Sequence, residues 1–469
     1  MTFLTTALNN PQSARYLSIA DQIESAINNG ELSPGDKLPT HRSLAEQLGV
    51  TIGTVTRGYA EAQRRGIVNA VVGSGTFVTV QQLPDIQFSH LIPRVSGNGA
   101  GNDDIDLSLN LPVANQPAPG MSRIAQEILG NQKHYLELML YQHDQGLERH
   151  RRWAIDWLKS KGVNCCIENL SVTCGGQHGI TLALMAATRP GDTIAAEGLA
   201  YPGIKAAANQ QNLKIIGLPL DEQGVLPDAF ASQCMLHHLR AIYLSPTIQN
   251  PTNTRMGLRR RKQIIEVAEK HNVWIIEDDV STNYLKHTPN SLADLAPERT
   301  FYINSHSKNV APGLRTGYLV SPPALRDPVS AIIRAQCWFA PALNVELAQR
   351  WLEKEDSIRW LNQQKRELSK RRQLVDKLLG KHNIKTAKGS FHAWLPIPDP
   401  WRAMEFQSLL STKGIKVLSA ESFAVGRFPA TEAIRICLTG PATRHQLEKG
   451  LTVIKQQLEN DYSAVLSVF

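Results

Sequence analysis

The run SHSKNVAPGLRTGYL, residues 305–319, carries the strongest chemical signal in this chain. Two serines stand just before Lys308, Arg315 follows, and the run ends in apolar residues typical of a strand. A lysine among hydroxyl groups and a second cation is the pattern of a reactive amine held beside an anion. The rest of the sequence must therefore indicate which anion binds here.

Composition is that of an ordinary globular protein of 469 residues, with 42% hydrophobic and 20% charged residues. No apolar run approaches the roughly 20 residues that a membrane span needs. The opening MTFLTTALNNPQSARYLS lacks the pattern of a secretory signal, so we expect a cytoplasmic protein without membrane contact. The formal charge of +8 is not concentrated at the amino end, because residues 1–80 contain six basic and six acidic side chains.

The six cysteines follow no ligand pattern. They are Cys165, Cys166, Cys174, Cys234, Cys337 and Cys437. There is no CxxC motif and no cysteine–histidine spacing of a zinc site, so the sequence predicts reduced, mostly structural thiols and no metal site.

A change of composition divides the chain. Residues 81–104, QQLPDIQFSHLIPRVSGNGAGNDD, contain prolines, glycines and asparagines without a sustained period, which is typical of a linker. The sequence therefore predicts a small domain over residues 1–80 and a large one over residues 105–469.

The small domain has the pattern of a winged helix. An amphipathic helix is expected in YLSIADQIESAINNGEL, and two short helices in GDKLPTHRSLAEQLGVTIGTVTRGYAEAQRRGIV, the second running from Ile52 to about Arg65. IVNAVVGSGTFVTV then predicts two strands joined by a glycine-rich turn at residues 73–75. In such an α+β module the second helix enters the major groove of DNA while helix ends and wing contact phosphates.

KLPTHRSLAEQLGVTIGTVTRGYAEAQRRGIV and GSGTFV closely resemble the winged helix-turn-helix module of GntR-type regulators. The resemblance implies binding to a double-stranded DNA operator. The contacts it implies are Arg42, Thr51, Thr54, Thr56, Arg57 and Ser74. Taken singly, Arg42 and Arg57 are better interpreted as solvated surface charges, so the whole module carries the prediction. Ile52 and Ser74 stand where the family often has basic or polar residues, which predicts a modest grip on phosphates.

The large domain alternates short β-rich runs, such as LRAIYLSP, NVWIIEDD and RTFYINSHSK, with helical stretches. This alternation predicts an α/β domain with a largely parallel sheet, in which ligands bind at the carboxyl ends of the strands. Gly175 and Gly176 open a helix after one such strand, where backbone N–H groups and the helix dipole favour a phosphate. Asn250 and Asp278 follow two others.

One ligand accounts for these residues together. Its phosphate is expected at Gly175, Gly176, Ser305, Ser307 and Arg315. Its carbonyl condenses with Lys308, and Asp278 keeps a ring nitrogen protonated. That ligand is pyridoxal 5'-phosphate (PLP).

From about residue 105 to 460 the chain resembles the fold-type I aminotransferases. The motifs, in the family's order, are YQHDQGLERHRRWAIDWL, TCGGQHGI, YPG, QNPTN, EDD, SHSKNVAPGLRTGYL and AIRICL. The resemblance implies that Lys308 is the catalytic Schiff-base lysine. It also implies that Asn250 touches the ring oxygen, Asp278 the ring nitrogen and Tyr201 the ring face.

Three more roles come from the same resemblance. Tyr141 is expected to reach the phosphate across a dimer interface, Gln177 to help close the phosphate loop, and Arg435 to bind the substrate's α-carboxylate with its planar fork. Taken alone, Tyr201 also fits core packing and Arg435 a charge on a strand surface. If the predicted end of this strand is displaced by one residue, Asp279 takes the role of Asp278 at the ring nitrogen.

One departure concerns catalysis. The family usually has a tyrosine two or three residues beyond the ring-nitrogen aspartate, whereas this chain has Val280 and Ser281 there and Tyr284 further on. The lysine–cofactor bond is therefore expected to be tuned differently, which affects turnover more than binding.

A GntR-like winged helix joined by a linker to an aminotransferase-like domain is the organisation of MocR-type regulators, so the resemblance covers nearly the whole chain. It implies a homodimer that binds DNA and senses PLP or an amino compound reacting with it. The sequence thus predicts a PLP-dependent transcriptional regulator. The alternative is an active aminotransferase of amino-acid metabolism with a secondary winged helix. The amino-terminal module favours the regulator, and a regulator without cofactor conflicts with Lys308, Asp278 and Arg315.

Overall fold

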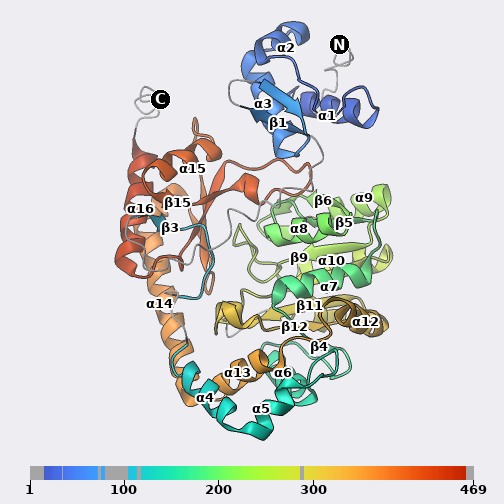
Figure 1. Ribbon diagram of the computed structural model, residues 1–469. Helices are drawn as coiled ribbons and strands as arrows, with labels where there is room; N and C mark the ends of the chain where they lie inside the picture. Colours follow the sequence, from blue (N-terminus) through green and yellow to red (C-terminus); the bar gives the residue numbers. More distant parts are fainter. Residues whose placement is uncertain are drawn as a thin grey trace. The chain divides into compact units, whose positions relative to one another are not determined.

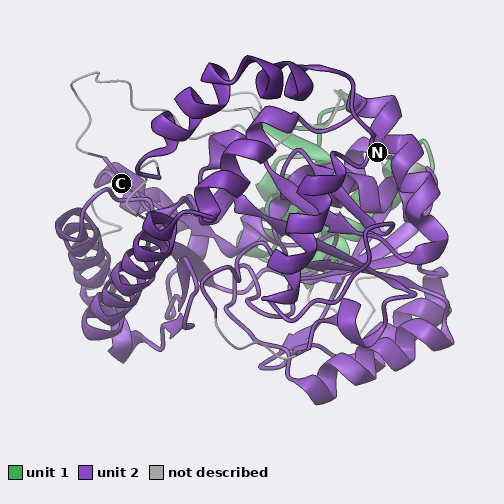
Figure 2. Cartoon of the chain, turned by 90° about the horizontal axis from the view of Figure 1, so that it is seen from below, with its two compact units in different colours: residues 1–92 green, residues 93–469 purple. Residues whose placement is uncertain are grey.

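The computed structural model divides the chain into two compact units, residues 1–92 and 93–469 (Figure 2). It describes residues 15–33, 35–71, 75–79, 104–113, 118–285 and 290–460. The predicted linker lies outside these residues except for Asp104, and so does Ser74 in the wing. No helix in the described ranges is long and apolar enough to cross a membrane.

The small unit has the predicted winged-helix elements. They are α1 (Arg15–Asn28), α2 (His41–Leu48), α3 (Ile52–Arg64), β1 (Val68–Val71) and β2 (Gly75–Val78). The two strands pair antiparallel, with Val68 opposite Val78. One core joins all five elements through Ile19, Leu44, Val55, Val68 and Val78.

Side-chain caps fix the start of both helices of the helix-turn-helix. The Thr40 side chain accepts a hydrogen bond from the Ser43 N–H group, and Thr51 accepts one from Thr54. A cap of this kind contributes about 1 kcal/mol. Both caps involve backbone groups only three residues away, so the boundaries of α2 and α3 follow from local chemistry.

The large unit is built on a seven-stranded sheet in the order β4-β12-β11-β10-β9-β5-β6 (Figure 1). The strands are β4 (Leu170–Thr173), β5 (Thr193–Glu197), β6 (Lys214–Leu218), β9 (Ala241–Leu244), β10 (Trp274–Asp278), β11 (Thr300–Ser305) and β12 (Gly317–Val320). Only β12 runs against its neighbours; the pairs β10–β11, β9–β10, β5–β9 and β5–β6 are parallel. The predicted largely parallel α/β sheet is confirmed.

Helices cover both faces of this sheet. Ile194 and Ala196 of β5 pack with α7 (Gly176–Ala187), α8 (Pro202–Gln210) and α12 (Arg326–Cys337). Ala195, which points the other way, packs with α9 (Pro227–His237) and α10 (Leu258–Lys270). Because successive strand residues alternate between faces, the sheet is apolar on both sides and forms the middle of three layers.

A second, antiparallel sheet has the order β13-β14-β17-β16. Its strands are β13 (Lys385–Thr386), β14 (His392–Pro396), β16 (Leu418–Ser419) and β17 (Ala433–Cys437), and its helices are α15 (Ala403–Thr412) and α16 (Arg444–Glu459). The long α14 (Glu355–Leu379) leads into it from α13 (Ala342–Leu352) (Figure 1). β3 (Ile105–Asp106) pairs in parallel with β15 (Ile415–Lys416), so the first described residues of the unit lie beside this carboxyl-terminal sheet.

The remaining elements lie at the edges of the unit. They are α4 (Met121–Gly130), α5 (Gln132–Met139), α6 (Glu148–Lys159), β7 (Leu220–Asp221), β8 (Gly224–Val225) and α11 (Leu292–Leu295). Of these, α4 and α5 share a core with α13.

Candidate functional site

The residues predicted to bind one ligand follow neighbouring strands of the large sheet. Asp278 ends β10 and Ser305 ends β11, which pair in parallel, so both residues leave the same edge of the sheet. Lys308 closes a short 3-10 turn directly after β11. β4 lies antiparallel beside β12 and leads into Gly175 at the start of α7.

The Lys308 amine is largely buried and donates a hydrogen bond to the carbonyl oxygen of Asn110. The pKa of this amine is lowered to about 8, mainly by burial and also by the charges of Arg435 and Arg315, while Cys437 and Asp278 oppose the shift. A lysine with this pKa carries an appreciable neutral fraction near neutral pH, and the neutral amine is the nucleophile.

Asp278 and Asp279 have different surroundings. Asp278 is partly exposed; its Oδ2 accepts a hydrogen bond from the Tyr243 hydroxyl at 2.5 Å and its Oδ1 accepts one from the Val280 N–H group at 3.1 Å. Asp279 is buried, and its Oδ2 accepts from Tyr302 (2.6 Å) and from another hydroxyl of its own turn. Burial raises the pKa of both carboxyl groups. The geometry favours Asp278 for ligand contact, since Asp279 is held inside the protein.

Tyr243 is a residue that sequence reasoning missed. It lies on β9 opposite Ile276 of β10, so its hydroxyl reaches the end of the next strand. The only sequence signal is the run AIYL itself, because cross-strand neighbours are not visible without the register. Tyr284 does not replace the family's missing tyrosine beside the amine, since its hydroxyl donates to the backbone oxygen of Lys308 at 3.5 Å.

The residues predicted to bind a phosphate lie close together around Gly175. A Cβ atom at Gly175 would lie 2.5 Å from Nη2 of Arg315, and Gly175 has a φ of +86°. Arg315 donates from Nη1 to the Ser307 hydroxyl at 3.5 Å and from Nη2 to the Cys174 carbonyl at 3.2 Å. The hydroxyl oxygens of Ser305 and Ser307 lie 2.9 Å apart. Two hydroxyls, a guanidinium and the amino end of α7 therefore share one small region.

Gln177 and Tyr201 are neighbours beside this region. Gln177 donates to the Gly203 carbonyl at 2.9 Å, and its buried Oε1 has no hydrogen-bond partner among the described residues. A Cβ atom at Gly203 would meet both the Gln177 Oε1 and the Tyr201 ring at 2.1 Å. Burial raises the pKa of Tyr201 to about 12, and the charge of Asp278 raises it further.

Arg435 on β17 is buried, so its interpretation as a strand-surface charge is wrong. Its Nη1 donates to the Asn250 side-chain oxygen at 2.9 Å and its Nη2 to the Ser108 carbonyl at 2.6 Å. The guanidinium carbon lies 4.7 Å from the centre of the Phe423 ring, and Nε has no partner among the described residues. The second sheet thus brings the predicted carboxylate-binding arginine to the predicted ring contact, Asn250.

Tyr141 is not part of this group. Its side chain is 83% exposed, and its ring packs edge-on against Trp338 and Phe339. No contact with the residues around Lys308 is found in the part of the chain that the structure describes. Its role at a partner's phosphate stays a prediction.

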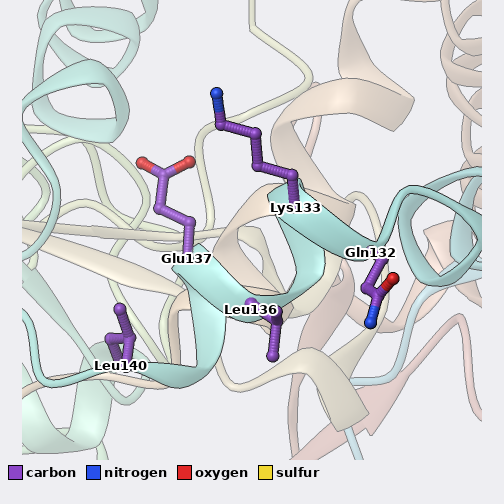
Figure 3. Close-up of a pocket in the computed structure, with 5 residues that line it drawn as sticks. All are labelled: Gln132, Lys133, Leu136, Glu137 and Leu140. Carbon is purple, nitrogen blue, oxygen red and sulfur yellow. The ribbon is translucent and has the colours of Figure 1, made fainter.

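A shallow hollow on the surface lies along α5 and is separate from these residues (Figure 3). Its lining residues are Gln132, Lys133, Leu136, Glu137 and Leu140. All come from α5 and its carboxyl-terminal cap, and none was predicted to bind a ligand. Two of them are exposed leucines, so this is an apolar surface and not a catalytic pocket.

In the small unit, the predicted DNA contacts Arg42, Thr51, Thr56 and Arg57 are exposed and Thr54 is partly so. Thr51 also caps α3 by accepting a hydrogen bond from the Thr54 N–H group, and the Thr56 hydroxyl donates to the Ile52 carbonyl. The Arg57 guanidinium lies 4.3 Å from the centre of the Tyr16 ring on α1. The exposed candidates therefore lie on α2, which carries Arg42, and on the amino-terminal half of α3.

Arg64 and Arg65 bind acidic side chains instead. Arg64 forms an ion pair with Glu61 at 2.7 Å, and Arg65 with Asp21 at 2.6 Å and Glu24 at 3.0 Å. The Arg64 pair lies within α3, whereas Arg65 ties the carboxyl end of α3 to α1. This agrees with the even balance of charge in the sequence.

A family model described as aminotransferase class I and II matches residues 105–454. The chain belongs to the class I and II aminotransferase family. A second model, bacterial regulatory proteins of the gntR family, matches residues 15–78. An aminotransferase-family domain after a GntR domain is the organisation of MocR-type regulators, so the resemblance drawn from the sequence motifs is confirmed.

Relatives of this aminotransferase-family chain include proteins named as transcriptional regulators. The uncharacterized HTH-type transcriptional regulator YdeF of Bacillus subtilis is 27% identical over 453 residues, covering 95% of this chain and 94% of its own length. The probable rhizopine catabolism regulatory protein MocR of Rhizobium meliloti is 25% identical over 343 residues, covering 68% and 67%. A solved structure, kynurenine aminotransferase of Pyrococcus horikoshii, has a TM-score of 0.68 at 21% identity and covers 76% of this chain and 92% of its own, which shows the fold.

Proposed function

We propose that this protein is a transcriptional regulator that binds PLP at Lys308, senses PLP or an amino compound reacting with it, and binds a double-stranded DNA operator through α3. One chain combines a lysine of lowered pKa, a winged helix, and the group of Gly175, Ser305, Ser307 and Arg315, which we call the phosphate cradle. This combination is the observation that carries the proposal.

The donor set around Lys308 fits PLP. Ser305, Ser307 and Arg315 offer hydroxyl and guanidinium donors for a phosphate, and the glycine at 175 keeps free the space where a Cβ atom would meet Arg315. The orphaned, buried Oε1 of Gln177 adds a polar atom that lacks a partner among the described residues.

When bound, PLP supplies an aldehyde that condenses with primary amines and a pyridine ring that, once protonated, withdraws electrons. Lys308 supplies the amine, which burial keeps partly neutral. Asp278 would supply the carboxylate that holds a proton on the ring nitrogen, and Tyr243 donates a hydrogen bond to that carboxylate. Arg435 offers a guanidinium to a ligand carboxylate, which must displace its contact with Asn250 or with Ser108.

Sensing follows from competition for the same groups. An amino compound that replaces Lys308 and engages Arg435 makes contacts that one conformation of the domain offers better than another. Any difference in affinity between two states shifts their populations and thereby the placing of the DNA-binding unit. Val280 in place of the family's usual tyrosine favours sensing over turnover, while the alternative remains an active aminotransferase.

We also propose that the large unit forms a homodimer. Four large apolar side chains within residues 136–141 are exposed, namely Leu136, Met139, Leu140 and Tyr141. Figure 3 shows two of them, Leu136 on α5 and Leu140 at its carboxyl end. Exposed apolar patches of this kind often mark protein interfaces. A second copy is the expected occupant, since Tyr141 is predicted to serve a partner's phosphate. Sedimentation of the full chain measures this.

The test of PLP binding is a titration of the apoprotein followed by visible absorption. A new band from the covalent lysine adduct is expected, and borohydride should fix the cofactor on Lys308, detectable by peptide mass spectrometry. Lys308→Ala should lose both signals. Lys161→Met is the matched control, because burial lowers the pKa of Lys161 to about 8 as well. If Lys308→Ala keeps the band, PLP is not held at this lysine and the proposal fails.

A further inference from the structure

Two thiols and one imidazole from distant parts of the sequence lie together beside the phosphate cradle. The ligand atoms of Cys174, His178 and Cys337 all lie within 4.8 Å of one another. Cys174 stands just before Gly175, His178 lies in the first turn of α7, and Cys337 is the last residue of α12. The packing of α12 against α7 brings the three together, which the sequence spacing did not predict.

The histidine ring is held in the tautomer that a metal ligand needs. His178 Nδ1 accepts a hydrogen bond from the Cys174 N–H group at 3.0 Å, so the ring proton is on Nε2. Nε2 then donates to the Gln336 side-chain oxygen at 3.0 Å, and the amide of Gln336 is itself held by a 3.0 Å contact from its nitrogen to the Met185 sulfur. A ring N–H bound to an outer acceptor is the usual support of a metal-binding histidine.

We propose that Cys174, His178 and Cys337 form a binding site for a thiophilic divalent cation of the Zn²⁺ type, with two thiolates and one imidazole as ligands. This set leaves a fourth tetrahedral position for water or another ligand. The cation must displace the Cys174 N–H group from Nδ1, a loss of about 1 kcal/mol for one hydrogen bond. The free energy gained from two thiolate bonds to a soft cation is much larger than this loss.

Occupation of the site has a structural consequence for the cradle. The cation ties the carboxyl end of α12 to the residue that precedes Gly175, and Arg315 already donates to the Cys174 carbonyl. Trp338, directly after Cys337, has a φ of +67°, a strained backbone that a fixed neighbour helps to hold. The cation site does not depend on PLP binding, so the two proposals fail separately.

The experiment uses the full chain, reduced and freed of metal by chelation, without PLP. Titration with Co²⁺ should give the sulfur-to-cobalt charge-transfer band and the strong visible bands of tetrahedral coordination, saturating at one ion per chain. Zn²⁺ should abolish both. Affinity for Zn²⁺ is then measured by competition with a chromophoric chelator.

Variants assign the ligands. Cys337→Ser should lower Zn²⁺ affinity by more than about 100-fold, since even outer-shell changes commonly lose 10- to 100-fold, and His178→Gln should do the same. Cys166→Ser is the matched control, because Cys166 is an exposed thiol outside the cluster, and it should bind like the unchanged protein. Because Cys337 is exposed, its serine variant should keep the fold, which thermal unfolding verifies.

Two results would overturn the proposal. The first is the absence of a thiolate–cobalt band, or a band that Cys337→Ser leaves unchanged. The second is oxidation of the metal-free protein with loss of two thiols that Cys337→Ser prevents, together with no Co²⁺ binding by the reduced chain. The pair would then be a redox couple and not a cation site.

Discussion

Gly175→Ala is the sharpest test of the phosphate cradle. The new methyl group would lie 2.5 Å from Arg315 Nη2 and 2.9 Å from its guanidinium carbon, so the guanidinium must move. The residue also has a φ of +86° and a ψ of 175°, a region essentially restricted to glycine, where a side chain costs about 1–3 kcal/mol. Strain and clash therefore act together at this position.

Gly162→Ala separates the two effects. Gly162 has a φ of +81° and no atom within 4 Å of a Cβ atom, so alanine there introduces strain alone. Arg315 is exposed, so displacing it from the Cys174 carbonyl and the Ser307 hydroxyl loses about 0.5–1.5 kcal/mol. Gly175→Ala should thus be less stable than Gly162→Ala by at least about that amount.

The assay has two parts. Denaturant unfolding of the large unit gives the stability difference between the two variants, and a PLP titration gives the affinity difference. A misplaced Arg315 should weaken PLP binding at least about tenfold, since 1.4 kcal/mol corresponds to a factor of ten. Gly162→Ala should bind PLP like the unchanged chain. Equal PLP affinity in the two variants would refute the assignment of Gly175 and Arg315 to the phosphate.

Three further outcomes are expected. Tyr243→Phe removes the 2.5 Å hydrogen bond that Tyr243 donates to the Asp278 carboxylate, so the pKa of Asp278 should rise further and the loss of PLP binding at low pH should move to higher pH. A pH profile of PLP binding that does not move would argue against contact between Asp278 and the ring nitrogen. Arg42→Ala should weaken binding of DNA from upstream of the gene and reduce by about 1 the slope of the log binding constant against log salt concentration in gel shifts. Because the Arg64 guanidinium is paired with Glu61, Arg64→Ala should leave that slope unchanged. Lys308→Met should raise the stability of the apoprotein below pH 8, because the buried amine has a pKa of about 8 in the folded chain and 10.5 in the unfolded chain. The cost of burying the charged amine is fully present below pH 8 and disappears as pH rises toward 10.5. Denaturant unfolding at pH 7 and pH 10 checks this, and a variant no more stable than the parent at pH 7 would contradict the lowered pKa.

Local patterns predicted much of the fold. The caps at Thr40 and Thr51 fix α2 and α3 because their side chains bond to backbone groups only three residues away. Apolar runs separated by helical stretches predicted the parallel strands that end at Asp278 and Ser305. The motif order predicted the family, since one ligand requires all those residue types together.

Register and side-chain direction were beyond the sequence. The choice between Asp278 and Asp279 needed the structure, because successive strand residues face opposite sides and only the hydrogen bonds of each carboxylate reveal which side is inside. Tyr243 was missed for the same reason, since its partner lies on a neighbouring strand.

The sequence by itself determined the two domain types and the residue kinds of the proposed PLP site, because these depend on local periodicity and on motifs within short segments. Only the tertiary structure decided that Arg435 meets Asn250 and that Cys174, His178 and Cys337 converge. Those contacts join β17 to the turn after β9, and α12 to α7. Long-range contacts are set by how layers pack around a shared core, and packing depends on the whole chain at once.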